Sequence, residues 1–215
     1  MGKLITASIL DSYDWYVSCP PHFKESALQQ ISDALNRKPW DPTPAILRGM
    51  AFEKKVCANL DNIRLAEFMA KFEGHSPNMD IFWKKCRTGR QQAKVSKTIN
   101  VDGVDYYLYG KRDIAFADKT IDIKTTGDFK SPKYYLVKNQ HPMYIACTGI
   151  ELFEYLIAEY DDVTEKCVEV YEIEAGMPTE VALERIITKI REFITFLKTD
   201  DELLNAYNTM FCRSW

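Results

Sequence analysis

The chain has 215 residues, enough for one domain with a sizeable core. Hydrophobic residues make up 46% of it and charged residues 27%, which is the composition of an ordinary globular protein. A formal net charge of −3 excludes a global attraction to nucleic acid, so any DNA-binding surface has to be a local basic patch. No apolar run reaches transmembrane length, and "MGKLITASIL" lacks the layout of a signal peptide, which predicts a cytoplasmic protein without a membrane partner.

The N-terminal part is expected to be helical. The spacing of its apolar residues predicts helices over about residues 3–18, 23–36, 44–60 and 63–72. Three prolines in "RKPWDPTP" interrupt regular structure between the second and third helices. Thr43 is suited to cap the third helix, and Pro44 is suited to its first position.

From about residue 92 the apolar period becomes that of β-strands. "AKVSKTINV" and "VDYYLYGKRDIAF" flank the turn residues Asp102 and Gly103 and predict a hairpin. "TIDIKTT" is a further strand after a turn at "ADK", and a helix follows near residues 140–149. "FEYLIAEYD" and "CVEVYEIEA" predict two more strands.

The C-terminal part returns to helices. Thr179–Lys198 is amphipathic, with one apolar face formed by Leu183, Ile186, Ile187, Ile190, Ile194 and Leu197. "DDELLNAYNTMF" predicts a short last helix. The order of elements defines an α/β or α+β fold with a central mixed β-sheet flanked by helices. We expect one domain over residues 1–215, helical to about 75, with the sheet core at about 92–175 and C-terminal helices at about 179–212.

Asp113, Asp122 and Lys124 interrupt the apolar sequence of two predicted adjacent strands. Residues i and i+2 of a strand project to one face about 6–7 Å apart, so Asp122 and Lys124 share a face while Ile121 and Ile123 face the core. A turn around residues 117–119 brings Asp113 of the preceding strand near Asp122. Neighbouring carboxylates repel unless they share a cation, and oxygen ligands suit Mg²⁺ or Mn²⁺.

The acid-x-Lys triplet is a weak signal when it stands alone. The chain contains it three times, at residues 53–55, 122–124 and 128–130, and a solvated face is its usual explanation. Only the triplet at 122–124 lies in strand sequence with an acid on a neighbouring strand. There, a lysine on the acidic face could orient or activate a water and offset the charge of a phosphate.

A further acid lies within the predicted helix at 44–60. Ile46, Met50, Glu53, Cys57 and Leu60 follow a spacing that places them on one face, so Glu53 lies within an apolar stripe. Burying a carboxylate there is costly without a partner. Either Glu53 reaches the edge of the stripe or pairs with a core arginine, or it is aimed at the sheet as another acid of the metal site.

The segment "NQHPMY" begins the helix near residue 140. Asn139 can cap this helix, and Pro142 is tolerated in its first turn. Gln140 and Tyr144 are four residues apart and share a face, where they could contact a phosphate or a base beside free backbone N–H groups. The alternative is an ordinary capping turn with a buried tyrosine. His141 points elsewhere and is assigned no role.

Two basic stretches could supply the local charge that nucleic acid requires. The first contains Lys84, Lys85, Arg87, Arg90, Lys94 and Lys97 without an intervening acid, and a solvated loop explains it equally well. The second follows the acidic strand and contains Lys130, Lys133 and Lys138 with Tyr134 and Tyr135 among them. Phosphate contacts plus aromatic stacking fit a duplex end or a single strand.

Other chemistries lack their sequence signatures. The chain has no GxxxxGK phosphate loop, and no GxSxG or Cys–His pattern. Its six cysteines form no CxxC pair or zinc spacing, so we expect reduced thiols.

Taken together, "GMAFE" with Glu53, Asp113, Asp122-x-Lys124 and Gln140-x-x-x-Tyr144 resemble the PD-(D/E)XK nucleases. The match is best to the RecB-like and phage-exonuclease branch, whose N-terminal "Y..CP..F" segment is similar to "SYDWYVSCPPHF". The resemblance covers about residues 7–150 and departs from the family at Arg112, which stands where the family has proline. Cys19 matches the first cysteine of an iron–sulfur cluster found in some relatives, but Cys212 stands alone, so no cluster is expected.

The resemblance implies a restriction-endonuclease-like core and a role for each matched residue. Asp113 and Asp122 would bind Mg²⁺ or Mn²⁺ with the backbone carbonyl of Ile123, and Lys124 would assist the nucleophilic water. Glu53 would complete the acidic shell. Gln140 and Tyr144 would act beside the site on DNA or on its geometry.

The implied function is a metal-dependent DNA nuclease, an exonuclease of phage or bacterial recombination or repair. A metal-activated water would hydrolyse the phosphodiester without a covalent intermediate. The implied partners are DNA ends or single strands, a single-strand annealing protein or helicase, and further copies of the chain. The alternative is a catalytically silent nucleic-acid-binding or recombination-accessory module of the same fold.

Overall fold

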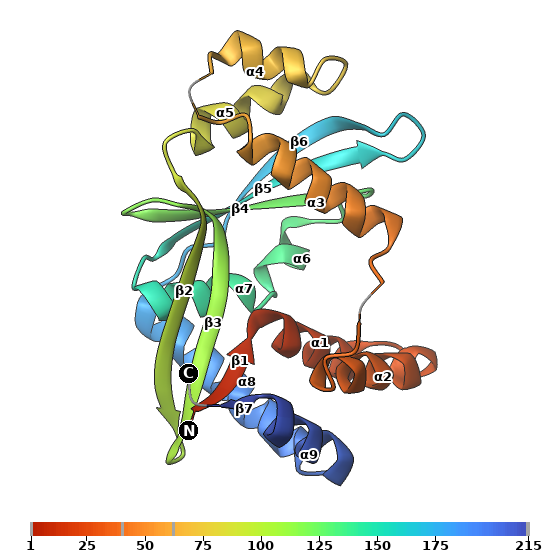
Figure 1. Ribbon diagram of the computed structural model, residues 1–215, viewed down its shortest axis with the longest axis vertical. Coiled ribbons are helices and arrows are strands. Elements are labelled where there is room, and N and C mark those ends of the chain that lie inside the picture. The colour runs from red at the N-terminus through yellow and green to blue at the C-terminus, as the bar shows by residue number, and fades with distance from the viewer. Residues whose placement is uncertain (1, 40, 62, 214–215) are drawn as a thin grey trace.

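The hairpin formed by β2 (Arg90–Val101) and β3 (Val104–Ala115) is the longest strand pairing of the sheet. Asp102 and Gly103 both have positive φ, as the tight hairpin turn requires, and they place Val101 opposite Val104. The computed structural model describes residues 2–39, 41–61 and 63–213. Within these residues the sheet has seven strands in the order β6-β5-β4-β3-β1-β7, with β2 also paired to β3 (Figure 1).

The remaining strands are shorter than β2 and β3 and come from distant parts of the chain. They are β1 (Gly2–Thr6), β4 (Lys119–Thr126), β5 (Leu152–Asp161), β6 (Lys166–Glu174) and β7 (Cys212–Arg213). β1 runs parallel to β3 and β4 runs parallel to β5, whereas the other pairs are antiparallel. The predicted mixed β-sheet flanked by helices is therefore confirmed.

Helices cover both faces of the sheet. One layer contains α3 (Pro44–Cys57), α4 (Leu65–Lys71) and α5 (Asp80–Cys86). The other contains α1 (Ala7–Ser18), α2 (Lys24–Leu35), α7 (Gln140–Thr148), α8 (Thr179–Leu197) and α9 (Asp201–Met210). The short α6 (Pro132–Leu136) and two 3₁₀ turns, Pro21–Phe23 and Pro77–Met79, complete the described helices.

The alternation of side chains along β4 and β5 separates two hydrophobic cores. Ile121, Ile123 and Leu156 pack with the layer of α3, α4 and α5. Tyr155 and Ile157 pack with the layer of α1, α7 and α8. Because Asp122 is the register partner of Tyr155, it projects toward the α7 layer.

The sheet opens on one side of β3, and this opening positions the site. β1 pairs with β3 up to Tyr109, whereas β4 pairs with the same side of β3 only at Ile114 and Ala115. Residues 110–113 of β3 therefore lie between the two neighbouring strands. We call this interval the sheet split.

Several sequence predictions differ from the structure. The helix expected over residues 3–18 is wrong for residues 3–6, which form β1 and end at Thr6, whose hydroxyl accepts from Ile9 N at 3.4 Å and caps α1. The buried pairing of Leu4 and Ile5 beside β3 outweighs the local helical pattern. Neither α5 nor α6 was predicted, and α3 ends at Cys57, before the expected Leu60.

Other predicted elements are confirmed. Thr43 caps α3 and accepts a hydrogen bond from Ile46 N at 3.4 Å, with Pro44 in the first turn. α8 matches its predicted range to within one residue, although Leu183, Ile187 and Ile194 lie only partly buried at the edge of its face. Among the described residues, no helix is both long and apolar enough to span a bilayer.

Candidate active site

The two aspartates lie close together where β3 and β4 begin to separate. Asp122 is fully buried and forms an ion pair with the ammonium of Lys124 on the same strand. Asp113 is 9% exposed, and its Oδ2 accepts a hydrogen bond from Ile123 N at 2.9 Å. The N–H and C=O of a strand residue point to the same side, so the Ile123 carbonyl also faces the sheet split.

The charges of this group are not balanced. Burial raises the pKa of Asp113 well above its usual range, and the charge of Asp122 raises it further. Burial also lowers the pKa of Lys124, but the charges of Asp122 and Asp113 outweigh this effect and raise its pKa overall. Lys124 is therefore an ammonium at neutral pH, one cation beside two buried carboxyl groups. Such a pair of carboxyl groups favours a second cation or a proton.

α3 brings Glu53 to the edge of this group. A Cβ on Gly49 would lie 2.7 Å from Thr125 Oγ1, so glycine permits the close packing of α3 on β4. The expected apolar stripe through Glu53 is wrong, because Ile46 and Met50 are 38% and 57% exposed. The helix instead buries a face that contains Phe52 and Val56, which leaves Glu53 half-buried at the boundary.

Gln92 joins Glu53 to Asp113, and sequence reasoning did not single it out. Its Nε2 donates to Glu53 Oε1 and lies 3.5 Å from Asp113 Oδ1. Its φ of 53° is in the left-handed region, which a residue other than glycine seldom adopts. Counting back from the turn at Asp102 and Gly103 places residue 92 opposite Asp113, so the hairpin register could have identified it.

α7 brings Gln140 and Tyr144 to the site from the opposite layer. Gln140 Nε2 donates to Asp122 Oδ1 and lies 3.4 Å from Tyr144 Oη. Tyr144 Oη donates to Lys111 O at 2.9 Å and accepts from Lys111 N at 3.3 Å. The phenol therefore satisfies backbone groups of the sheet split. Burial, and then the charge of Asp122, raise the pKa of Tyr144, so it remains protonated.

The segment before Gln140 is held by side chains of α1 and α8. Asn139 does not cap α7 as expected, because its backbone is helical and its Nδ2 donates instead to Asp11 Oδ1 at 3.0 Å and Asp14 Oδ2 at 2.7 Å. Arg185 donates to the carbonyls of Leu136, Val137 and Lys138 at 3.3, 2.6 and 3.0 Å. His141 is buried, and its Nδ1 lies 3.1 Å from Tyr155 Oη.

The structure separates the two predicted basic stretches. Lys84 pairs with Asp80, and Lys85 pairs with Glu154 and Glu172. Glu154 projects to the α5 layer, opposite to Asp122, because the two side chains alternate across the sheet. Arg87 lies over Trp83 at 4.4 Å, and Arg90 is exposed at the start of β2.

The second basic stretch precedes Gln140 directly. Lys138 Nζ lies 4.5 Å from the ring centre of Tyr134, which is 54% exposed, and Lys133 is also exposed. Lys130 pairs with Asp128. Exposed cations with an exposed ring therefore lie on the segment that leads into the site.

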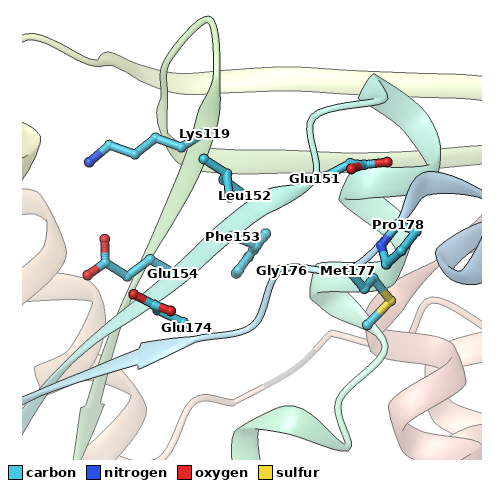
Figure 2. Close-up of a pocket in the computed structure, with 9 residues that line it drawn as sticks. All are labelled: Lys119, Glu151, Leu152, Phe153, Glu154, Glu174, Gly176, Met177 and Pro178. Carbon is cyan, nitrogen blue, oxygen red and sulfur yellow. The ribbon is translucent and has the colours of Figure 1, made fainter.

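Two cavities adjoin the site from the two layers. One of about 540 Å³ is lined by Glu53, Gln92 and Lys111 among others. The other, of about 290 Å³, is lined by Gln140, Tyr144 and the end of β1. A cavity of about 580 Å³ lies elsewhere, at the start of β4 and β5. In Figure 2, Glu154 and Glu174 lie side by side there, and none of the predicted site residues is among those that line it.

The donor set fits a hard divalent cation, although the three acids do not form one shell. In the described part of the chain no group of three His, Cys, Asp or Glu residues is arranged to hold a metal ion. The Gln92 amide stands between Glu53 and Asp113. Asp122 Oδ2 is buried, with the Lys124 ammonium nearby but no hydrogen bond of ordinary geometry from the described residues. A buried carboxylate oxygen of this kind suits a cation that accepts oxygen ligands.

Comparison with solved structures places this arrangement in a known fold. The chain has the fold of an alkaline exonuclease. That structure, LHK-Exo from Laribacter hongkongensis, is 15% identical, with a TM-score of 0.50 over 97% of this chain and 94% of that one. Its complex with dAMP gives 16% identity and a TM-score of 0.45 over 98% and 95% of the two chains. A third structure, that of SSO0001, is 16% identical, with a TM-score of 0.49 over 89% of this chain and 77% of that one. No protein-family model and no curated protein matches the sequence.

Proposed function

We propose that the chain is a metal-dependent deoxyribonuclease of the RecB-like and phage-exonuclease branch of the PD-(D/E)XK nucleases. The observation that carries the proposal is the grouping of Asp113, Asp122, Lys124, Gln140 and Tyr144 at the sheet split. Likeness in fold to an alkaline exonuclease supports it. An exonuclease acting in phage or bacterial recombination or repair is the form of the activity that we favour.

Asp113 and Asp122 would hold a magnesium or manganese ion, with the carbonyl of Ile123 and, once freed from Gln92, Glu53. When bound, such an ion lowers the pKa of a water and offsets the charge of the phosphodiester. The residues themselves supply two rigid oxygen donors, because Asp113 is fixed by the Ile123 amide and Asp122 by the amide of Gln140.

Lys124 would act as a donor and not as a base. The charges of Asp122 and Asp113 raise the pKa of Lys124 and keep it an ammonium with three N–H bonds, which can orient a water or stabilise a phosphate oxygen. Gln140 would hold the Asp122 carboxylate in one orientation, and Tyr144 would fix Gln140 relative to the backbone of Lys111. In this assignment Gln140 and Tyr144 are positioning residues.

The nucleic acid would reach the site along the segment that contains Lys133, Tyr134 and Lys138. Its cations suit phosphates, and the exposed ring of Tyr134 suits stacking on a base. A single strand or a duplex end is the substrate form that we favour. A single-strand annealing protein, a helicase or further copies of the chain are partners of the proposed pathway.

End-labelled linear duplex, nicked circle and single strand, incubated with Mg²⁺, Mn²⁺ or EDTA, test the proposal. We expect cleavage with either ion, none in EDTA, and a loss of at least a hundredfold in Asp122→Asn, which keeps the volume of the side chain. Melting temperatures in EDTA establish that the variant is folded. An Asp122→Asn protein as active as the unmodified chain would refute the assignment.

The second candidate is a silent nucleic-acid-binding module. The arrangement of Lys124 against Asp122 and of Gln92 between Glu53 and Asp113 favours it, because a cation and an amide of the chain itself already contact these carboxylates. In that case DNA would bind without cleavage, and adding Mn²⁺ would change neither DNA binding nor the melting temperature.

A further inference from the structure

Gln92 has three unusual features beside two acids of the candidate site. Its amide donates to Glu53 and lies within 3.5 Å of Asp113, so one NH₂ group contacts two carboxylates. Its backbone is left-handed, a conformation that costs about 1 kcal/mol or more for a residue with a Cβ. Its side chain also lines the cavity shared by Glu53 and Lys111.

The strained backbone aims the amide. Gln91 and Ala93 pair with Ile114 and Arg112 of β3, whereas no such pair joins Gln92 to Asp113. The left-handed φ thus interrupts a regular ladder at one residue, and that residue's side chain contacts the two acids. Strained backbone conformations cluster at active sites and ligand clamps, where they pre-organise the groups that act there.

We propose that Gln92 controls cation access to the acidic site by occupying, with its side-chain amide, the position between Glu53 and Asp113 that a divalent cation takes. The inference rests on the proposed function, since it requires that the acids bind a cation. A partial positive charge on the NH₂ group reduces the repulsion between the two carboxylates when the cation is absent. A cation must displace the amide before both acids can bind it, so Gln92 weakens binding and makes it selective for an ion strong enough to compete.

If Gln92 has this role, removing its side-chain amide should increase the affinity of the site for Mn²⁺. Gln92→Met keeps the length of the side chain and removes its donor. A hydrogen bond to a charged group is lost from the cation-free state only, so Mn²⁺ should bind at least about tenfold more tightly. Gln92→Gly removes the side chain and suits the positive φ, and it should change the affinity in the same direction. Gln92→Glu adds a carboxylate and should tighten binding by about tenfold or more.

Gln91→Met is the matched control. Gln91 is the neighbouring residue, and its Nε2 donates to Cys57 O at 2.9 Å and Asp61 Oδ2 at 3.3 Å. The Gln91→Met variant therefore loses an amide of the same kind beside the same cavity, but this amide contacts neither Glu53 nor Asp113. Its affinity for Mn²⁺ should equal that of the unmodified chain.

The experiment is calorimetric titration of EDTA-stripped protein with Mn²⁺, together with melting temperatures in EDTA and in Mn²⁺. We expect Gln92→Met to melt below the unmodified chain in EDTA and to gain more stability from Mn²⁺, because a ligand that binds more tightly stabilises more. Unchanged or weaker Mn²⁺ binding in Gln92→Met and Gln92→Gly, with binding intact in the unmodified chain, would overturn the role of Gln92 alone. If the unmodified chain gives no heat and no melting shift, both this inference and the metal-dependent function fail.

Discussion

Gly110→Ala tests whether the contact of Tyr144 with the sheet split is as tight as the structure requires. A Cβ at residue 110 would lie 2.1 Å from Tyr144 Cε1, where an ordinary contact is 3.4–4 Å. The ring would have to move by more than about 1 Å, and its hydroxyl would then leave the backbone of Lys111. Overpacking costs about 1–3 kcal/mol and the loss of the hydrogen bond that Tyr144 Oη donates to Lys111 O about 1 kcal/mol, which together give about 2–4 kcal/mol.

Reversible urea unfolding measures this loss, and a melting temperature lower by about 5–15 °C should accompany it. In a Tyr144→Leu background, which has no ring to displace, Gly110→Ala should cost less than about 1 kcal/mol, so the two changes should show a coupling of about 2 kcal/mol. Gly2→Ala is the control, because its Cβ would lie at an ordinary 3.7 Å from the nearest atom. Equal costs of Gly110→Ala in both backgrounds would refute the steric argument.

The remaining predictions concern the elements around the site. Burial lowers the pKa of His141 to about 3 from 6.5, with the charge of Arg185 adding to the effect, so the unfolded chain binds this proton first and stability falls as the pH falls from 6.5 toward 3. Between pH 6.5 and 5 the loss should be about 2 kcal/mol, and His141→Gln should remove it in urea unfolding while the exposed His22→Gln does not. Arg185→Met should cost about 1–3 kcal/mol and speed amide hydrogen exchange in residues 132–140, and no change in exchange would contradict the anchoring role. Lys133→Ala and Lys138→Ala should each reduce the number of ions released on DNA binding by about one, as measured by a salt titration. Lys84→Ala and Lys85→Ala should leave that number unchanged, because both amines are paired with acids. The opposite pattern would place the nucleic acid on the face of the sheet that α5 covers.

The parts of the fold that follow from local sequence were predictable. The turn at Asp102 and Gly103 determines the hairpin, and Thr43 followed by Pro44 determines where α3 begins. The alternation of Asp122 with Ile121 and Ile123 also predicted which side chains face the core. Each of these features depends on residues within a few positions of one another.

What depended on distant partners was not predictable. β1 has a helical apolar pattern, and only its place beside β3 makes it a strand. The buried face of α3 is set by the aromatic core around Phe52, so Glu53 came out at an edge and not in a stripe. Asn139 has a good capping side chain, but Asp11 and Asp14, more than a hundred residues earlier, take its hydrogen bonds.

The candidate site was predictable in its members but not in its connections. The strand spacing indicated that Asp113, Asp122 and Lys124 lie together, and the family resemblance added Gln140 and Tyr144. The structure brings these side chains together at the sheet split. Gln92 escaped notice because a glutamine at the start of a strand has no typical role. The left-handed φ of Gln92 follows from the fold and has no local sequence signal.

The opening of the sheet between β1 and β4 makes the site an assembly of two independently packed halves. Glu53 is carried by one hydrophobic core and Gln140 by the other, and the acids of β3 and β4 lie where the two meet. Partial melting of either half would separate the side chains of the candidate site while much of the helix content survived. A site of this design forms only when both halves are packed, so any activity that depends on it would appear at the last step of folding.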